Sequence, residues 1–338
     1  MRRSKLNARA LFPAVFLMLA IDLIITAFTE KEYFRAQVTI PATILNSALT
    51  LGILWLLLRL SQSGLLAKWC HVILASLMAF SAGCTITRTE QFWRFTSNAM
   101  YSSMLIYGIF LAVLFYLLRS GMETTLRLVN LMLVPFLFSI GLLIAANLVQ
   151  MQPENLIVRP FSMCEIIQSA QAGFCLSPVL LIPLVFAKGD RRRKMRSFSK
   201  IFGAIVILGT ILSLFGEMVL GEQAAQQTLV FHSLSRLGRL SVFKRMDALH
   251  VWIWSMVEFS KAALYACTAQ KSILLIRVDC KHPEIWAVGG VLLGVILTNL
   301  CSEGWQQVIQ SAGTTGLMVC LVAAAMRERR HHGAQNAV

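Results

Sequence analysis

The sequence predicts an all-α integral membrane protein. Of its 338 residues, 57% are hydrophobic and only 14% are charged, and the mean hydropathy is +0.68, far above the range of soluble domains. Runs of roughly 17 to 25 mostly apolar residues, long enough to cross a bilayer as a helix, recur along the chain. No connection between them exceeds about 25 residues, so residues 1–338 are expected to form a single polytopic domain. The ten predicted spans are 11–28, 40–60, 70–87, 100–118, 126–148, 164–187, 201–221, 246–268, 284–301 and 308–326.

The first apolar run follows the basic segment MRRSKLNAR, a pattern shared with secretory signals. No small-x-small cleavage site follows it, and further spans do, so we interpret it as a retained first helix. Asp22 lies in the middle of this helix with no basic residue nearby on the same helix. It must therefore stay protonated, pair with a base such as Lys261 on another helix, or line a cavity.

The distribution of positive charge predicts the topology. When loops are assigned alternately to the two sides, twenty-one lysines and arginines fall on the side that holds both termini and nine fall on the other. By the positive-inside rule, both termini are cytoplasmic. The net charge of +15 is then mainly topological. We interpret the basic run at 188–200 as a cytoplasmic loop beside anionic lipid, in preference to a nucleic-acid site, so no nucleic acid is expected as a partner.

The sixth span contains residues that break helices. Gly173, Pro178 and Pro183 lie within it, and Ser177 precedes the first of the prolines. Two interpretations remain open. An unwound helix exposes backbone groups and helix ends, with which many secondary transporters hold a zwitterionic substrate near the midplane. The alternative is a proline kink whose freed backbone group is satisfied by Ser177.

Residues 222–244 have the pattern of a short amphipathic helix. Phe231, Leu234, Leu237 and Leu240 recur near helical spacing, with basic residues between them. We expect this segment to lie on the outer membrane surface, with a loosely structured loop as the alternative.

Small residues within the spans indicate close packing. Gly290 and Gly294 form a GxxxG pattern in the ninth span, which permits the close approach of another helix. The eight cysteines lack metal-site spacing and predict small apolar packing contacts. Only Cys84, Cys164 and Cys301 are placed where a disulfide on the outer side is possible.

The eighth span carries a polar stripe on an otherwise apolar helix. At 100° per residue, the polar side chains between Asp247 and Tyr265 fall within about 80° of one another, so the stripe must face protein or a water-filled cavity. Glu258 and Lys261 are three residues apart within it. They form either a structural or gating ion pair, or a proton relay or ligand contact. The stripe consists of Asp247, His250, Trp254, Glu258, Lys261 and Tyr265.

Three further acids lie at membrane edges: Glu123 before the fifth span, Glu165 opening the sixth and Glu217 late in the seventh. Glu217 is close enough to the end of its span to extend toward the surface. The sequence contains no Walker A, HExxH, GxSxG or strand-linked GxGxxG pattern. We therefore expect no enzymatic activity, no cofactor and no metal site.

Residues 235–271 resemble the signature segment of the spore germination permease family, the B subunits of bacterial germinant receptors. Two weaker similarities lie upstream, through Gly121, Glu123 and Arg127 at the entry to the fifth helix, and through Gly173 and Phe174 in the sixth. The residues that match the signature segment are Arg245, Asp247, Ala248, Leu249, Trp254, Lys261 and Tyr265.

The resemblance implies a fold, a function and partners. The family belongs to the amino acid-polyamine-organocation transporters, which implies two inverted five-helix repeats with broken first and sixth helices. It further implies a subunit in the spore inner membrane or plasma membrane that senses a germinant, usually a small amino acid, and works with a membrane-anchored A subunit and a C lipoprotein. Ligand-binding candidates are then Gly173, Phe174, Ser177 and Asp22.

The first span departs from the family pattern because it has Pro13, no glycine, and Asp22 in its middle. Two other functions therefore stay open. One is a proton-coupled secondary amino acid transporter, in which Glu258 or Asp22 carries the proton. The other is a non-binding scaffold that only assembles its partner subunits.

Overall fold

The regular elements of the structure are helices. The computed structural model describes residues 8–26, 35–60, 68–97, 102–156, 162–173, 177–187, 190–226, 230–238, 247–277, 280–302, 305–306 and 308–320. The α-helices are α1 (Ala8–Thr26), α2 (Ala36–Leu60), α3 (Lys68–Ser97), α4 (Ser103–Ser120), α5 (Met122–Asn147), α6 (Met163–Gly173), α7 (Leu181–Phe186), α8 (Arg191–Leu220), α9 (Val230–Leu237), α10 (Asp247–Ile276) and α11 (Pro283–Leu300). A further apolar helix covers Val308–Cys320. Short 3-10 segments are η1 (Leu148–Gln150), η2 (Pro153–Asn155), η3 (Pro178–Leu180) and η4 (Gly221–Gln226).

Six helices in the described part of the chain are long and apolar enough to cross a membrane, which makes this a multi-pass α-helical membrane protein. They correspond to the second, third, fourth, fifth, seventh and ninth predicted spans. The helices Ala10–Ile24 and Val308–Cys320 are apolar but shorter. The spans are Ala36–Arg59, Trp69–Thr96, Ser103–Ser120, Met122–Gln150, Arg191–Leu220 and Pro283–Leu300.

Two predicted spans differ from a simple apolar helix. The sixth is divided: α6 ends at Gly173, and helical structure resumes at η3 and α7. The eighth corresponds to α10, a 30-residue helix that is not among the six apolar spans because its polar stripe lowers its hydropathy.

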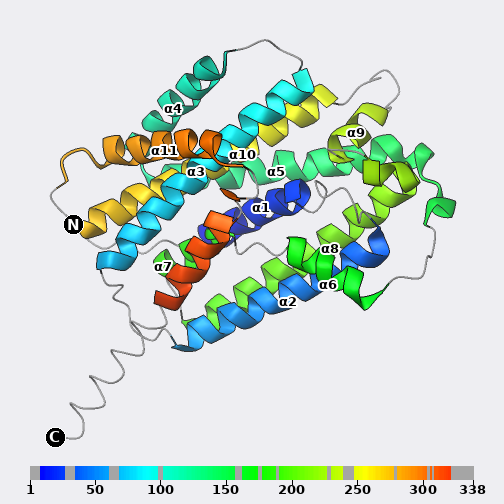
Figure 1. Cartoon of the computed structure of the whole chain (residues 1–338), viewed down its shortest axis with the longest axis horizontal. Helices are drawn as coiled ribbons and strands as arrows, with labels where there is room; N and C mark the ends of the chain where they lie inside the picture. The colour runs from blue at the N-terminus through cyan, green and yellow to red at the C-terminus, as the bar shows by residue number, and fades with distance from the viewer. Residues whose placement is uncertain are drawn as a thin grey trace, which may run out of the picture.

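The helices form two groups with α1 between them (Figure 1). In one group α3 packs against α10, α11 and α4, and in the other α2 packs against α8 and α6. α1 contacts members of both groups, namely α10 and α8, and it also contacts α5, α7 and η3. A change in the position of α1 would therefore alter helix contacts in both groups.

The first helix is continuous. α1 runs from Ala8 to Thr26 with Pro13 inside it, so the expected break in the first span is wrong for these residues. Pro13 lies near the beginning of the helix, where few backbone hydrogen bonds are lost. No glycine follows it to unwind the chain.

The crossing of α3 and α11 confirms the close approach expected from the GxxxG pattern. A Cβ atom added to Gly83 of α3 would lie 2.5 Å from the carbonyl carbon of Gly294, and one added to Gly294 would lie 2.9 Å from the backbone oxygen of Ala79. The two backbones therefore touch, and Gly83 is the partner that the sequence pattern alone had not identified. Close to the same crossing, the hydroxyl of Thr298 and the thiol of Cys84 lie 3.3 Å apart.

Glu217 has a different role from the one expected. Its side chain is buried, and its carboxylate accepts a hydrogen bond of 2.7 Å from the backbone N–H of Ala36, the first residue of α2. A carboxylate at this position satisfies a backbone donor that has no partner within its own helix and complements the helix dipole. The expectation that Glu217 extends to the surface is wrong, because the start of α2 covers it.

Residues 230–237 are helical, but their apolar side chains face the protein. Phe231 and Leu234 are buried, and α9 packs against α5, α8 and α10. The carbonyl oxygen of Leu234 accepts a hydrogen bond from the side chain of Asn147 in α5. Most of the apolar face of α9 is therefore used in tertiary packing, and Leu237 at its end is exposed. Leu240 lies outside the described residues.

Candidate functional site

The polar stripe of α10 faces the protein interior, as its pattern predicts. α10 contacts α1, α3, α4, α5, α9 and α11, and from Val257 onward nearly every face of the helix is buried. The apolar faces were expected to contact lipid, and this is so only near the start of the helix, where Leu249, Trp252 and Met256 are exposed. The stripe residues from His250 to Tyr265 are each 5% exposed or less.

A charged cluster near the end of α1 joins three separate segments of the chain. The ammonium group of Lys261 forms an ion pair and hydrogen bond with Asp22 Oδ1, and the hydroxyl of Ser177 donates a hydrogen bond of 3.0 Å to Asp22 Oδ2. Ser177 immediately precedes η3, at the division of the sixth span. Asp22 therefore connects the first, sixth and eighth predicted spans through its two carboxylate oxygens.

Glu258 is the second acid of the cluster. Its Oε1 lies 3.8 Å from the ammonium nitrogen of Lys261, which is within ion-pair range but too long for a hydrogen bond. Both carboxylate oxygens are buried without a hydrogen-bond partner among the described residues. Arg88 of α3 also interacts electrostatically with this carboxylate. Lys261 is thus shared by two acids, and Asp22 holds it more closely.

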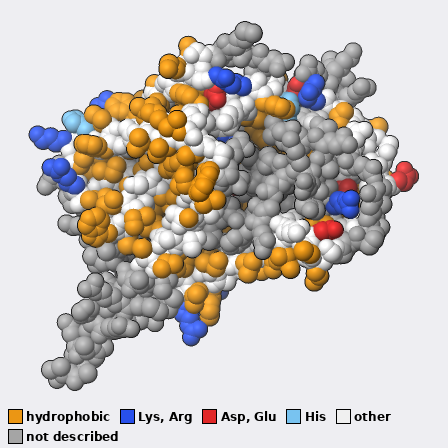
Figure 2. Space-filling model, in the orientation of Figure 1, with side chains coloured by type: hydrophobic (Ala, Val, Ile, Leu, Met, Phe, Trp, Pro, Cys, Tyr) orange, Lys and Arg blue, Asp and Glu red, His pale blue; other side chains and the backbone are white. Residues whose placement is uncertain are grey.

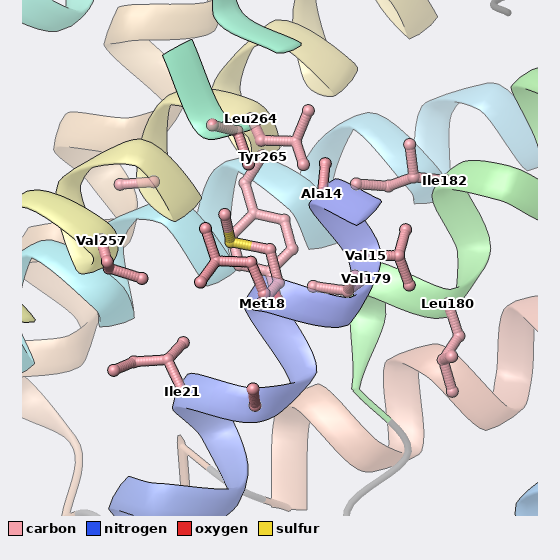
Figure 3. Close-up of a cluster of buried hydrophobic side chains, with 14 of the residues drawn as sticks. Ala14, Val15, Met18, Ile21, Val179, Leu180, Ile182, Val257, Leu264 and Tyr265 are labelled. Atoms are coloured by element: carbon pink, nitrogen blue, oxygen red, sulfur yellow. The ribbon is translucent and has the colours of Figure 1, made fainter. Parts of the chain in front are cut away.

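Apolar side chains from α1, η3 and α10 pack together in the core (Figure 3). Met18 of α1 lies next to the ring of Tyr265 of α10, and Val179 of η3 lies beside α1. Met18 and Val179 are fully buried, and Tyr265 is 2% exposed. In this structure the side chains of α1, η3 and α10 themselves occupy the interface where the resemblance led us to expect a ligand.

Aromatic side chains pack at the opposite end of the stripe from Lys261. The ring of Trp254 is stacked on Phe92 of α3 with 5.8 Å between ring centres, and it also contacts Phe231 of α9. The imidazole of His250 lies 4.5 Å from the same indole. Trp254 is therefore part of the packing between α3, α9 and α10.

The other predicted residues are dispersed. Gly173 is the last residue of α6, and Asp247 is the first of α10. Phe174 and Arg245 lie outside the described residues. Glu165 is in the first turn of α6 and is partly exposed.

Glu123 belongs to a second, smaller grouping near the opposite end of α10. It is exposed in the first turn of α5, one turn before the exposed Arg127. Burial lowers the pKa of Lys271, which follows the predicted eighth span, and the carboxylate of Glu123 acts in the opposite direction. The ammonium nitrogen of Lys271 lies 5.0 Å from the ring centre of Phe186, at the end of α7. Side chains of α5, α7 and α10 therefore meet around Lys271.

The sequence interpretation missed Glu90 of α3. This buried acid accepts a hydrogen bond of 2.8 Å from the hydroxyl of Ser103 and pairs with Arg94 one turn later. The predicted third span stopped at residue 87, whereas α3 continues to Ser97. The signal that could have extended it is the i,i+4 spacing of Glu90 and Arg94.

The cluster combines two carboxylates, an ammonium group and a hydroxyl, which can hold or exchange charge. Among the described residues, no group of three or more His, Cys, Asp or Glu side chains is placed to hold a metal ion. Cys84, Cys164 and Cys301 are free thiols, so the possible disulfide among them is not formed. No protein-family model matches the chain, and no curated protein is detectably similar to it.

Proposed function

We propose that this chain is a transporter-like membrane sensor of a small zwitterionic molecule, acting as the B subunit of a spore germinant receptor. The observation that supports this best is the junction at Asp22, where Ser177 at the division of the sixth span and Lys261 of α10 bind the same carboxylate. A helix break beside a buried charge is the arrangement with which transporters of this class hold polar ligands.

The packing of the helices is compatible with two inverted repeats of five spans. In such a fold, spans that occupy the same position in the two repeats are related by a two-fold axis and often pack against each other. The second predicted span, α2, contacts the seventh, α8, and the third, α3, contacts the eighth, α10. Both pairs are five spans apart, which supports the fold implied by the resemblance.

The junction suggests how a ligand signals. A molecule that binds between α1 and η3 must compete with Ser177 or Lys261 for Asp22 and displace the apolar side chains beside it. Because α1 contacts both helix groups, a state that separates α1 from α10 differs from the present one across the molecule. A ligand favours that state only if it binds it more tightly. The A subunit and the C lipoprotein would detect the change from the spore inner membrane.

The test is amino acid binding to the purified receptor assembly, measured by calorimetry with a panel of small L-amino acids. We expect binding of at least one, and loss of that binding in Asp22→Asn and Ser177→Ala with assembly intact. Ser120→Ala is the matched control, because the exposed hydroxyl of Ser120 donates to the carbonyl of Tyr116 in its own helix. Binding that is unaffected by Asp22→Asn and Ser177→Ala would place the ligand elsewhere.

A second candidate is a scaffold that binds no ligand. The specific observation in its favour is that Met18, Val179 and Tyr265 fill the α1–α10 interface. A scaffold predicts that Gly173→Trp leaves both assembly and germination unchanged, whereas a sensor predicts assembly without a response.

The third candidate is a proton-coupled amino acid transporter, and the buried carboxylate of Glu258 without a hydrogen-bond partner among the described residues is the observation that favours it. Substrate-dependent proton flux into liposomes that contain this chain alone would support transport, and Glu258→Gln should then abolish it. The absence of flux with retained binding would favour the sensor.

A further inference from the structure

The end of α2 and the beginning of α8 form one basic surface. α2 and α8 pack against each other, and the bond from Ala36 at the start of α2 to Glu217 near the end of α8 shows that they are antiparallel. The last turn of α2 and the first turn of α8 therefore lie at the same end of the pair. There, the guanidinium carbons of Arg59 and Arg191 lie 5.2 Å and 6.0 Å from the ring centre of Trp55.

The charge at this end is strongly unbalanced. Six basic residues and one acid, Asp190, occur between residues 190 and 200. The carboxylate of Asp190 accepts the backbone N–H of Arg191 as the N-cap of α8. The positive end of the α8 dipole meets the negative end of the α2 dipole there, so the excess positive charge comes from the side chains. Two guanidinium groups on one indole form a site with which an anionic group pairs favourably.

An apolar stripe leads directly to this basic surface. On α2 the exposed side chains follow helical spacing and include Leu45, Leu49 and Leu56, which are 37 to 49% exposed. Trp55 is 43% exposed at the end of this stripe, one turn before Arg59. Figure 2 shows the same order, with hydrophobic side chains along the lower edge of the molecule, over α2, and a group of basic side chains beside them.

Tryptophan beside arginine at the end of an apolar stripe marks the boundary between hydrocarbon and headgroups. A ligand that covers both the apolar stripe and the basic surface must be amphiphilic, with an anionic headgroup. This excludes a free phosphate or a nucleic acid as the best match, because neither covers the apolar stripe.

We propose that the α2–α8 basic surface, formed by Trp55, Arg59 and Arg191, binds the phosphate headgroup of an anionic phospholipid whose acyl chains lie along the exposed face of α2. Guanidinium groups bind phosphate oxygens through paired N–H donors. Trp55 holds both groups at the headgroup level through cation–π contacts. The bound lipid would stabilise the pairing of α2 with α8.

The test uses the full chain in mixed micelles, with phosphatidylglycerol or phosphatidylcholine of identical acyl chains, and counts bound lipid by native mass spectrometry. We expect the wild type to bind phosphatidylglycerol preferentially. The double variant Arg59→Gln/Arg191→Gln should bind it about 25-fold more weakly, because each basic residue near a membrane surface contributes about a factor of five. Trp55→Ala should reduce binding in the same direction.

The matched control is Arg119→Gln/Arg277→Gln. It removes the same charge from two exposed helix ends, where Arg119 lies over Phe115 of its own helix without a second guanidinium on that ring. Equal losses in both double variants would overturn the proposal in favour of a diffuse positive surface. So would equal binding of the two lipids, or competition by glycerol 3-phosphate or a short single-stranded DNA at the same concentration as the lipid.

Discussion

Lys261 of α10 is paired with Asp22 of α1, 239 positions earlier in the chain, and not primarily with Glu258 of its own helix. The ammonium group is hydrogen-bonded to Asp22 Oδ1, while Glu258 Oε1 is 3.8 Å away. Lys261 is 3% exposed. This pair therefore fastens α1 to α10 at a depth where an unpaired charge is expensive.

The pairing predicts that two second substitutions restore the stability of a Lys261 variant to different extents. Lys261→Met removes the cation that the partly buried Asp22 and the buried Glu258 share, and it should destabilise the protein by about 3 to 5 kcal/mol. Adding Asp22→Asn should restore more of the stability than adding Glu258→Gln, because Asp22 is the closer partner. Thermal denaturation in detergent would measure this. Equal rescue by the two substitutions would show that Lys261 is shared evenly.

The close crossing of α3 and α11 predicts that adding a single methyl group at Gly83 destabilises the protein. Gly83→Ala places a Cβ 2.5 Å from the backbone of Gly294 and should cost about 1 to 3 kcal/mol because the backbones must separate. Gly289→Ala is the control, since a Cβ there meets nothing within 4 Å, and alanine is the better helix former. A stability of Gly83→Ala equal to that of the control would contradict the crossing.

The cap on α2 predicts a local effect of Glu217. Glu217→Ala removes the acceptor for the backbone N–H of Ala36 and should cost about 0.5 to 2 kcal/mol. Hydrogen exchange should accelerate at the first amides of α2. Glu123→Ala, an exposed acid in the first turn of α5, serves as the comparison and should leave α2 unchanged. Unaltered exchange in Glu217→Ala would exclude a capping role.

Two side-chain amides hold α9 through hydrogen bonds, and we expect their substitutions to differ in their effects on stability. One is Asn147 of α5 and the other is Gln150 of η1. The buried side chain of Asn147 donates to the carbonyl of Leu234 at 3.2 Å, and the exposed side chain of Gln150 donates to Leu237 at 2.8 Å. Asn147→Ala should cost about 0.5 to 1.5 kcal/mol and expose α9 to hydrogen exchange, because a buried bond between α5 and α9 is lost while the Leu234 carbonyl keeps its bond from the backbone N–H of Gly238.

Gln150→Ala should have a smaller effect, since water replaces the lost bond at an exposed site. If both variants leave exchange in residues 230–237 at the wild-type rate, these two bonds do not hold α9 in place.

Much of this molecule could be predicted from local sequence. Apolar runs of membrane length identified the six long spans, and the 3.6-residue period placed His250, Trp254, Glu258, Lys261 and Tyr265 on one face that had to be buried. Gly173, Pro178 and Pro183 located the division of the sixth span, because glycine and proline weaken a helix wherever they occur. These features depend on composition and on neighbours within a few turns.

The sequence by itself determined that buried charges existed and on which helix faces they lay, and only the tertiary structure decided how they are paired. Spacing favoured Glu258 for Lys261, since they are three residues apart, yet the folded chain brings Asp22 closer. The same holds for Glu217 with Ala36 and for Gly83 with Gly294. The physical reason is that hydrophobic periodicity fixes which side of a helix is buried, whereas the partner at each buried position depends on helix crossings that no local pattern specifies.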